Sequence, residues 1–172
     1  MTPRAAPAKP NATHVNGVCF HTLEEVTMFT HLLLPTDGSK LSEATIQKGI
    51  EFAKNINAKV TGFCVIPELH FFSYETEIPA DVKQRVAKES RALAEKHLAV
   101  VATAARKAGV TCDTAHVTSD LPYDAIVKAA EEKGCDLIMM ASHGRRGVKG
   151  LLLGSETQKV LTHSRIPVLV FR

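Results

Sequence analysis

Short apolar runs alternate with amphipathic segments from residue 28 to the end of the chain. The first run, His31 to Thr36, is almost continuously apolar, which is typical of a strand buried on both faces of a parallel sheet. Further strands are predicted over residues 59–66, 110–117, 136–141 and 167–171. The intervening segments carry helix formers with apolar residues at helical spacing, and they predict helices over 41–57, 81–107, 122–133 and 155–164.

The predicted helices have recognisable end signals. Ser39 can cap the first helix, and Pro122 suits the first turn of the third. Gly109 and Gly134 are placed to stop the helices that precede them. Five strands and four helices in strict alternation indicate parallel βαβ units with right-handed crossovers. The predicted fold class is therefore α/β: an open, five-stranded, Rossmann-like parallel sheet with helices on both faces.

Residues 1–27 differ from the rest of the chain. The first eleven are rich in proline and alanine, and they lack the apolar segment and cleavage site of a secretory signal. Met28 directly precedes the first strand, and the codons of Glu24 and Glu25 form a purine run just upstream, as in a bacterial ribosome-binding site. We therefore expect a folded domain over 28–172 and a flexible or non-native extension over 1–27, with Met28 as a candidate start.

Composition narrows the class of protein. The 172 residues fit one domain, and 45% hydrophobic with 23% charged residues is typical of a globular protein. No apolar run is long enough to span a membrane. The net charge of +3 is small, and only Arg145, Arg146 and Lys149 cluster, so nucleic-acid binding is not expected. Four cysteines without a C-x-x-C pair indicate reduced core thiols and a cytoplasmic setting.

Two predicted strand ends carry candidate chemistry. Asp37 lies in a turn after the first strand, and a loop with four glycines in eleven positions follows the fourth strand and leads into the last helix. In open parallel sheets, ligands bind beyond the carboxyl ends of strands where the strand order reverses. If these two strands are neighbours at the reversal, both segments face one cleft.

The glycine-rich loop is suited to an anion. Glycines allow main-chain N–H groups to approach a phosphate, and the start of a helix adds unpaired donors. The loop is neither a Walker A motif nor a dinucleotide fingerprint. Two explanations need no ligand: Ser155 and Gln158 can form a capping box, and Asp37-Gly38-Ser39 is ordinary turn chemistry.

Three segments resemble the universal stress protein family over residues 28–172. They are the start at 31–39, the segment from Met140 through the glycine-rich loop to Thr157, and the Pro-Val-Leu-Val ending at 167–170. The nucleotide-binding branch of that family carries Gly-x2-Gly-x9-Gly-(Ser/Thr). Gly144, Gly154 and Ser155 match its last three elements, and Ala141 replaces the first glycine.

The resemblance implies a strand order of 3-2-1-4-5 and a site for ATP, or AMP or ADP. Asp37 would hold the ribose, with Pro35 and Thr36 beside it, and the main chain near Val65 would meet the adenine edge. The resemblance assigns the triphosphate to four residues, with Mg²⁺ bound through phosphate oxygens: Gly144, Gly154, Ser155 and Thr157. Ala141, His143, Arg145 and Glu156 complete the candidate set, with His143 and Arg145 preferred as solvated loop residues.

The expected function is that of an ATP-binding stress-response regulator, a nucleotide-dependent switch. His143, Arg145 and Glu156 are the candidates for assisting hydrolysis, but no spacing commits any of them, so at most slow ATP hydrolysis is expected. The alternative is a nucleotide-independent dimeric interaction module. An adenylating enzyme should carry Ser-Gly-Gly-x-Asp-Ser after the first strand, and this chain does not.

A homodimer is expected through the last strand. The segment from Ile166 to Phe171 is apolar and ends the sheet, so its free edge would invite aggregation if exposed. Pairing with a second copy removes that hazard, and the family resemblance also implies a dimer there.

Overall fold

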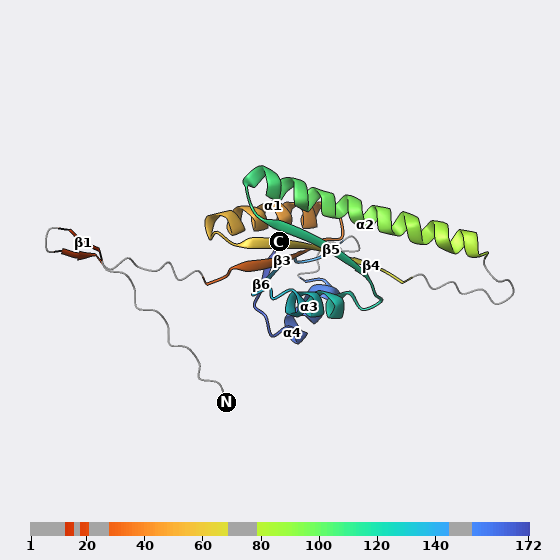
Figure 1. Ribbon diagram of the computed structural model, residues 1–172. Coiled ribbons are helices and arrows are strands. Elements are labelled where there is room, and N and C mark those ends of the chain that lie inside the picture. Colours follow the sequence, from red (N-terminus) through yellow and green to blue (C-terminus); the bar gives the residue numbers. More distant parts are fainter. Residues whose placement is uncertain (1–12, 16–17, 21–27, 69–78, 145–152) are drawn as a thin grey trace, which may run out of the picture.

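The computed structural model describes residues 13–15, 18–20, 28–68, 79–144 and 153–172. Its centre is a five-stranded parallel sheet of order β5-β4-β3-β6-β7, with β3 in the middle (Figure 1). The strands are β3 (His31–Pro35), β4 (Lys59–Ile66), β5 (Cys112–Thr118), β6 (Leu137–Ala141) and β7 (Val168–Phe171). Numbered along the sequence, this order is 3-2-1-4-5, so the predicted fold class is confirmed.

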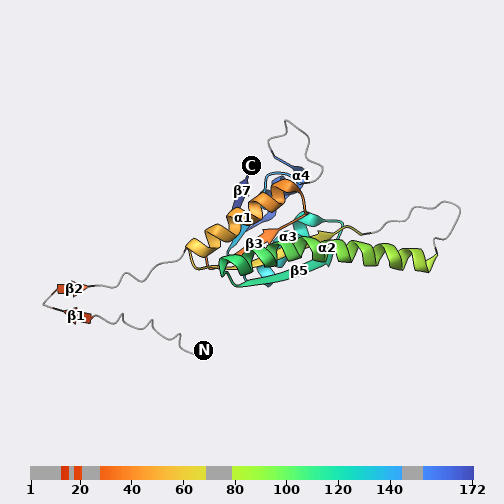
Figure 2. The same ribbon diagram turned by 90° about the horizontal axis from the view of Figure 1, so that it is seen from above.

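Four helices cover the sheet in two layers. Helices α1 (Lys40–Asn55) and α2 (Ala80–Ala108) lie on one face, and α3 (Pro122–Glu132) and α4 (Ser155–His163) lie on the other (Figures 1 and 2). The central strand shows why both faces need covering, because the side chains of Leu32, Leu33 and Leu34 are each 0% exposed. Leu32 and Leu34 pack in the cluster with α1 and α2, and Leu33 packs in the cluster with α3 and α4.

The predicted helix signals act as expected. The Ser39 hydroxyl accepts the Ser42 N–H at the start of α1, and Pro122 occupies the first turn of α3. Gly109 ends α2 in the left-handed region with φ of 74°. The prediction that a strand begins at Val110 is wrong by two residues, because the Val110 N–H donates to the carbonyl of Ala105 and completes the helix end.

A two-stranded antiparallel sheet in the N-terminal region was not anticipated. It pairs β1 (Thr13–Val15) with β2 (Val18–Phe20). The signal was present in the sequence, because Asn16-Gly17 between two short runs is the commonest two-residue hairpin connection. Whether residues 1–27 form an extension separate from the domain stays a prediction, and most of them lie outside the described residues.

Two of the cysteines behave as small core residues. The side chains of Cys64 and Cys135 are buried, and neither residue is in a disulfide. Burial raises the pKa of Cys135 to about 11, so this thiol stays protonated and unreactive at neutral pH.

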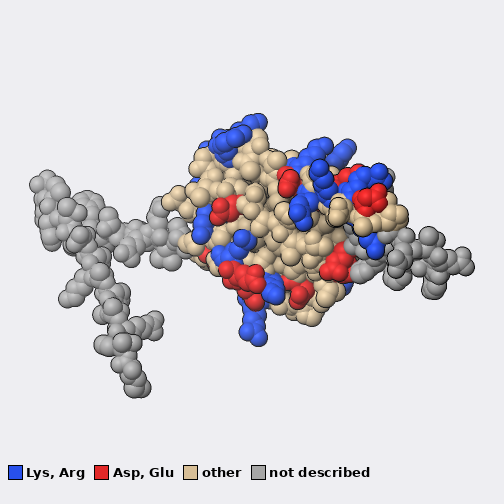
Figure 3. All heavy atoms as spheres, turned by 45° about the vertical axis from the view of Figure 1, so that its right-hand side comes forward, with Lys and Arg blue, Asp and Glu red and all other residues tan. Residues whose placement is uncertain are grey.

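The described surface carries both signs of charge. Basic and acidic side chains are interspersed on the face that Figure 3 displays, with uncharged surface between them. None of the helices in the described part of the chain has the length and apolarity needed to cross a membrane.

Candidate functional site

The two central strands separate at their carboxyl ends. The pairing of β3 with β6 covers only Leu32 with Leu137 and Leu33 with Ile138, although both strands continue beyond these residues. The crossover from β3 passes to α1 on one face, and β6 leads to α4 on the other face. This is the reversal of strand order at which open α/β sheets bind ligands.

The turn after β3 is held by its own side chains. Thr36 is buried, and its hydroxyl accepts the Gly38 N–H at 3.2 Å and the Ser42 hydroxyl at 3.0 Å. The Asp37 carboxylate accepts the Ser39 N–H through Oδ1 at 3.0 Å. The ordinary turn chemistry weighed from the sequence is therefore present. The bond to the Ser39 N–H orients the Asp37 carboxylate through Oδ1.

The Asp37 carboxylate lies against Gly144, the residue that follows β6 and the segment Ser142-His143. A Cβ atom added at Gly144 would collide with Oδ2 of Asp37. The turn after β3 and the described start of the glycine-rich loop therefore meet beyond the carboxyl ends of β3 and β6, as the sequence predicted for these two strand ends. The contact also gives Gly144 a specific reason to lack a side chain.

The described ends of the glycine-rich loop are tied together. The Gly154 N–H donates to the Ser142 carbonyl at 2.8 Å, and a Cβ at Gly154 would lie 3.2 Å from the Cα and Cβ atoms of His143. Glycine at 154 therefore permits a close backbone approach. Residues 145–152 lie outside the described residues, so the expected contribution of Arg145 stays a prediction.

Helix α4 begins with uncapped amides. Its N-cap residue is Gly154, which has no side chain to bond them, and the first intrahelical bond runs from the Gln158 N–H to the Gly154 carbonyl at 3.0 Å. Within the described chain, no acceptor is recorded for the N–H groups of Ser155, Glu156 and Thr157. The interpretation of Ser155 and Gln158 as a capping box is wrong, because Ser155 is the first helical residue and not the N-cap.

Three of the predicted site residues use their side chains to bond other residues of the protein. The Thr157 hydroxyl is buried and donates to the Ala141 carbonyl at 3.1 Å. The Glu156 carboxylate accepts the Tyr123 N–H at 3.0 Å, away from the loop. Nδ1 of the half-buried His143 lies 2.9 Å from the Ser142 hydroxyl. Any contact that Thr157 or Glu156 makes with a ligand in this arrangement therefore comes from its main chain.

The main chain of Val65 faces the side of β4 on which β3 has ended. The pairing of β3 with β4 ends at Pro35 and Phe63, and the Thr36 N–H still reaches the Phe63 carbonyl at 2.8 Å. The pairing of β4 with β5 continues to Ile66. Because alternate residues of a strand direct their main-chain groups to the same neighbour, Val65 faces the side where β3 has ended.

One neighbour of the site was missed by the sequence analysis. A Cβ at Gly38 would collide with the imidazole of His97, so this ring from α2 packs directly on the turn that carries Asp37. Nothing in the sequence pattern signals this contact, because it depends on how α2 lies across the sheet. The first glycine of the family motif, here Ala141, is buried in β6 at 8% exposure, and its carbonyl is bonded by Thr157.

The fold defines a doubly wound α/β protein in which Asp37 and Gly144 meet at the reversal of strand order. A family model described as the universal stress protein family matches residues 28–172. The match covers more than half of the chain, so the chain belongs to the universal stress protein family.

Individual relatives agree with this assignment. The universal stress protein MJ0531 of Methanocaldococcus jannaschii is 30% identical over 145 residues, which cover 84% of this chain and 83% of that protein. The solved structure of MJ0577, from the same organism, has a TM-score of 0.64 and 31% identity, and the match covers 83% of this chain and 95% of that one. A universal stress protein solved in complex with cAMP has a TM-score of 0.60 and 26% identity, with coverage of 84% and 98%.

The packing of His97 on Gly38 can be tested with two glycines of similar conformation. Gly38 has φ of 72° and Gly109 has φ of 74°, but a Cβ at Gly109 meets no atom within 4 Å. We expect Gly109→Ala to lower the free energy of unfolding by about 1 kcal/mol, because alanine disfavours this region. Gly38→Ala should cost about 2–4 kcal/mol, because the imidazole must also move.

Urea denaturation at neutral pH measures both costs. Measured in the His97→Ala background, Gly38→Ala should lose this excess and cost about as much as Gly109→Ala does in the wild type. Equal losses for the two single alanine variants would contradict the contact.

Proposed function

We propose that the protein binds an adenine nucleotide, ATP with Mg²⁺ in the first place, in the crevice between β3 and β6. The observation that carries this proposal is the contact of the Asp37 carboxylate with Gly144, beside the uncapped amides that open α4. Asp37 supplies acceptors for sugar hydroxyls, and the amides supply donors for phosphate oxygens. A nucleotide requires both kinds of group at a short separation.

The phosphates would be held mainly by the main chain. The N–H groups of Ser155, Glu156 and Thr157 lie at the positive end of α4, which favours an anion. Gly144 and Gly154 present no side chain that would keep a phosphate at a distance, and the exposed Ser155 adds a hydroxyl. Arg145, in the part of the loop outside the described residues, would add a positive charge.

The nucleoside would occupy the opposite side of the crevice. A carboxylate has about four acceptor sites on its two oxygens, so Asp37 can accept ribose hydroxyls while keeping its bond to Ser39. Pro35 and Thr36 would lie beside the ribose, and the main chain of Val65 would meet the adenine edge. The cAMP complex of the relative with 26% identity supports an adenine nucleotide as the ligand class.

Mg²⁺ fits this scheme as an ion bound through the phosphates. The described residues contain no group of three side chains suited to hold a metal. Mg²⁺ commonly keeps several waters and takes its other ligands from substrate phosphates, so it needs no protein cage here.

The site suits a regulatory switch better than a fast hydrolase. Hydrolysis needs a group that orients the attacking water, and Glu156, one candidate for that role, already bonds Tyr123 and Lys159. Nucleotide binding would instead stabilise the folded state by mass action. Cys64 and Cys135 are buried and form no disulfide, which fits the reducing cytoplasmic setting that we propose for this switch.

Nucleotide binding can be tested by calorimetry and thermal unfolding of the full chain with Mg-ATP. Saturation at about 100 times Kd should stabilise the protein by about 2.7 kcal/mol. Asp37→Asn keeps an oxygen for the Ser39 N–H and loses the carboxylate charge, so we expect affinity to fall about 10- to 100-fold.

The exposed Asp113 on β5, at the edge of the sheet, provides a matched control, and Asp113→Asn should leave the affinity within about twofold. Absence of any thermal shift at millimolar Mg-ATP would favour the alternative function, a nucleotide-independent dimeric module.

We also propose a symmetric homodimer through the segment from Ile166 to Phe171. Its strand, β7, lies at the edge of the sheet and pairs only with β6 among the described strands. The Pro167 carbonyl accepts the Ile138 N–H of β6, and the Phe171 carbonyl accepts the N–H of Ser142, the residue after β6. The main chain of Val168 and Val170 therefore faces the open edge. The half-exposed Leu169 adds apolar surface there.

This alternation gives a sharp test of the dimer. Val170→Pro removes an N–H from the open edge and keeps the bonds to β6, so it should give a folded monomer. Leu169→Pro removes a bond to β6 instead and should lower the free energy of unfolding by about 3 kcal/mol. Light scattering at tens of micromolar measures the mass. A monomeric wild-type protein, or a Val170→Pro variant that stays dimeric, would contradict this interface.

A further inference from the structure

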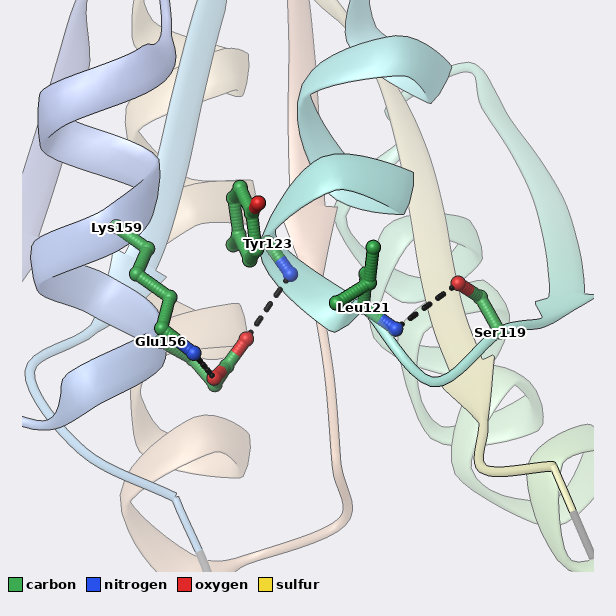
Figure 4. Close-up of polar contacts among 5 residues, drawn as sticks. All are labelled: Ser119, Leu121, Tyr123, Glu156 and Lys159. Carbon is green, nitrogen blue, oxygen red and sulfur yellow. Dashed lines mark hydrogen bonds and ion pairs between the residues drawn. The ribbon is translucent and has the colours of Figure 1, made fainter.

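The first turn of α4 is linked to the first turn of α3 by the side chain of Glu156. Figure 4 shows this carboxylate between the two helices, bonded to the main chain of Tyr123 on one side and to Lys159 on the other. Oε2 accepts the Tyr123 N–H at 3.0 Å, and Oε1 accepts the Lys159 ammonium at 2.9 Å. Glu156 therefore joins two helices on the same face of the sheet whose bonded residues are 33 positions apart in the sequence.

The bond to Tyr123 serves as a cap for α3. That helix begins after Leu121, a residue whose side chain cannot accept an N–H, and no side-chain cap is recorded for it. The Tyr123 N–H is one of the donors that a helix start leaves without an intrahelical partner. A carboxylate from α4 satisfies it and also lies favourably at the positive end of α3.

Neighbouring contacts hold Glu156 in this orientation. The Lys159 ammonium lies 5.3 Å from the centre of the Tyr123 ring, and the His163 ring lies 5.1 Å from the Tyr123 ring, centre to centre. The hydrogen bond from Lys159 to Glu156 raises the pKa of Lys159 further above neutral pH. Its positive charge also offsets the negative charge that Glu156 brings next to the amides of α4.

The same turn of α4 has a second attachment. The next residue, Thr157, donates its hydroxyl to the Ala141 carbonyl at the end of β6. One side chain thus ties the turn to the sheet and the adjacent one ties it to α3. The turn held by these two attachments carries the three uncapped amides of Ser155, Glu156 and Thr157.

We propose that Glu156 is a positioning residue for the nucleotide site, and this inference rests on the proposed function. Its carboxylate fixes the first turn of α4 against the start of α3, so that the amides are already aimed at the phosphates before the ligand arrives. From the sequence, Glu156 was expected to be one of the residues that contact the nucleotide. The structure assigns its side chain to the neighbouring helix.

Positioning implies a reciprocal effect at α3. If the bond between Glu156 and Tyr123 strengthens nucleotide binding, then nucleotide binding must strengthen that bond by the same factor. Mg-ATP should therefore increase the protection of the Tyr123 amide against hydrogen exchange, at a position outside the crevice. A carboxylate that only stabilised the fold would show no gain at Tyr123 beyond the general gain in protection that ligand binding gives amides exchanging through global unfolding.

Three variants of the full chain separate the possible roles. Glu156→Ala removes the bond, and we expect the affinity for Mg-ATP to fall about 3- to 10-fold, which corresponds to one hydrogen bond. Glu156→Gln keeps an oxygen for the Tyr123 N–H and should restore the affinity to within about twofold of wild type. Glu43→Ala, in the first turn of α1, removes an exposed carboxylate with no recorded cross-helix bond, and it should leave the affinity unchanged.

The readouts are calorimetric titration with Mg-ATP and hydrogen exchange of the Tyr123 amide with and without nucleotide. Equal losses in the Ala and Gln variants would overturn the proposal, because charge and not the bond would then matter. Unchanged affinity in Glu156→Ala, with wild-type protein that binds Mg-ATP, would also overturn it.

Failure of the proposed function has a different signature, since wild-type protein would then bind no Mg-ATP at all. The bridge can still be examined in that case without a ligand. Protection of the Tyr123 amide should be lost in Glu156→Ala and kept in Glu156→Gln, and equal exchange in all three proteins would overturn the bridge itself.

Discussion

The separation of β3 from β6 at their carboxyl ends is the constraint on which the site depends. The chain leaves β3 toward one face of the sheet and β6 toward the other. The separation of the two strand ends is therefore a consequence of topology. Leu33 and Ile138 pack in the core with α3 and α4, and beyond the strand ends Asp37 meets Gly144.

Around these strand ends, side chains and main chain have different tasks. The hydroxyls of Thr36 and Thr157 and the carboxylate of Glu156 all bond other parts of the protein. They hold the turn after β3 and the start of α4 in place, and main-chain amides remain available for a ligand. This division explains why the loop after β6 needs small residues at Gly144 and Gly154, where side chains would occupy the space.

Local and periodic signals made most of the fold predictable. The apolar run of β3, the cap at Ser39 and the left-handed glycine at 109 each depend on a few neighbouring residues. The meeting of Asp37 with Gly144 was predictable because strand order alone brings those two strand ends together. The bond of Glu156 to Tyr123 could not be predicted, because it depends on how α3 and α4 lie side by side on the sheet. No spacing in the sequence encodes the relative position of these two helices.

In the nucleotide complex that we propose, main-chain amides of the loop after β6 and of α4 bind the phosphates. The carboxyl ends of β3 and β4 bind the nucleoside. Amide chemical shifts of the ¹⁵N-labelled full chain, recorded during titrations with Mg-ATP and with adenosine, test it most directly. We predict that ATP shifts the amides of Gly144, Ser155 and Thr157, and that adenosine shifts mainly those of Asp37 and Val65. Binding of ATP that leaves all of these amides unmoved and shifts residues elsewhere would contradict the account.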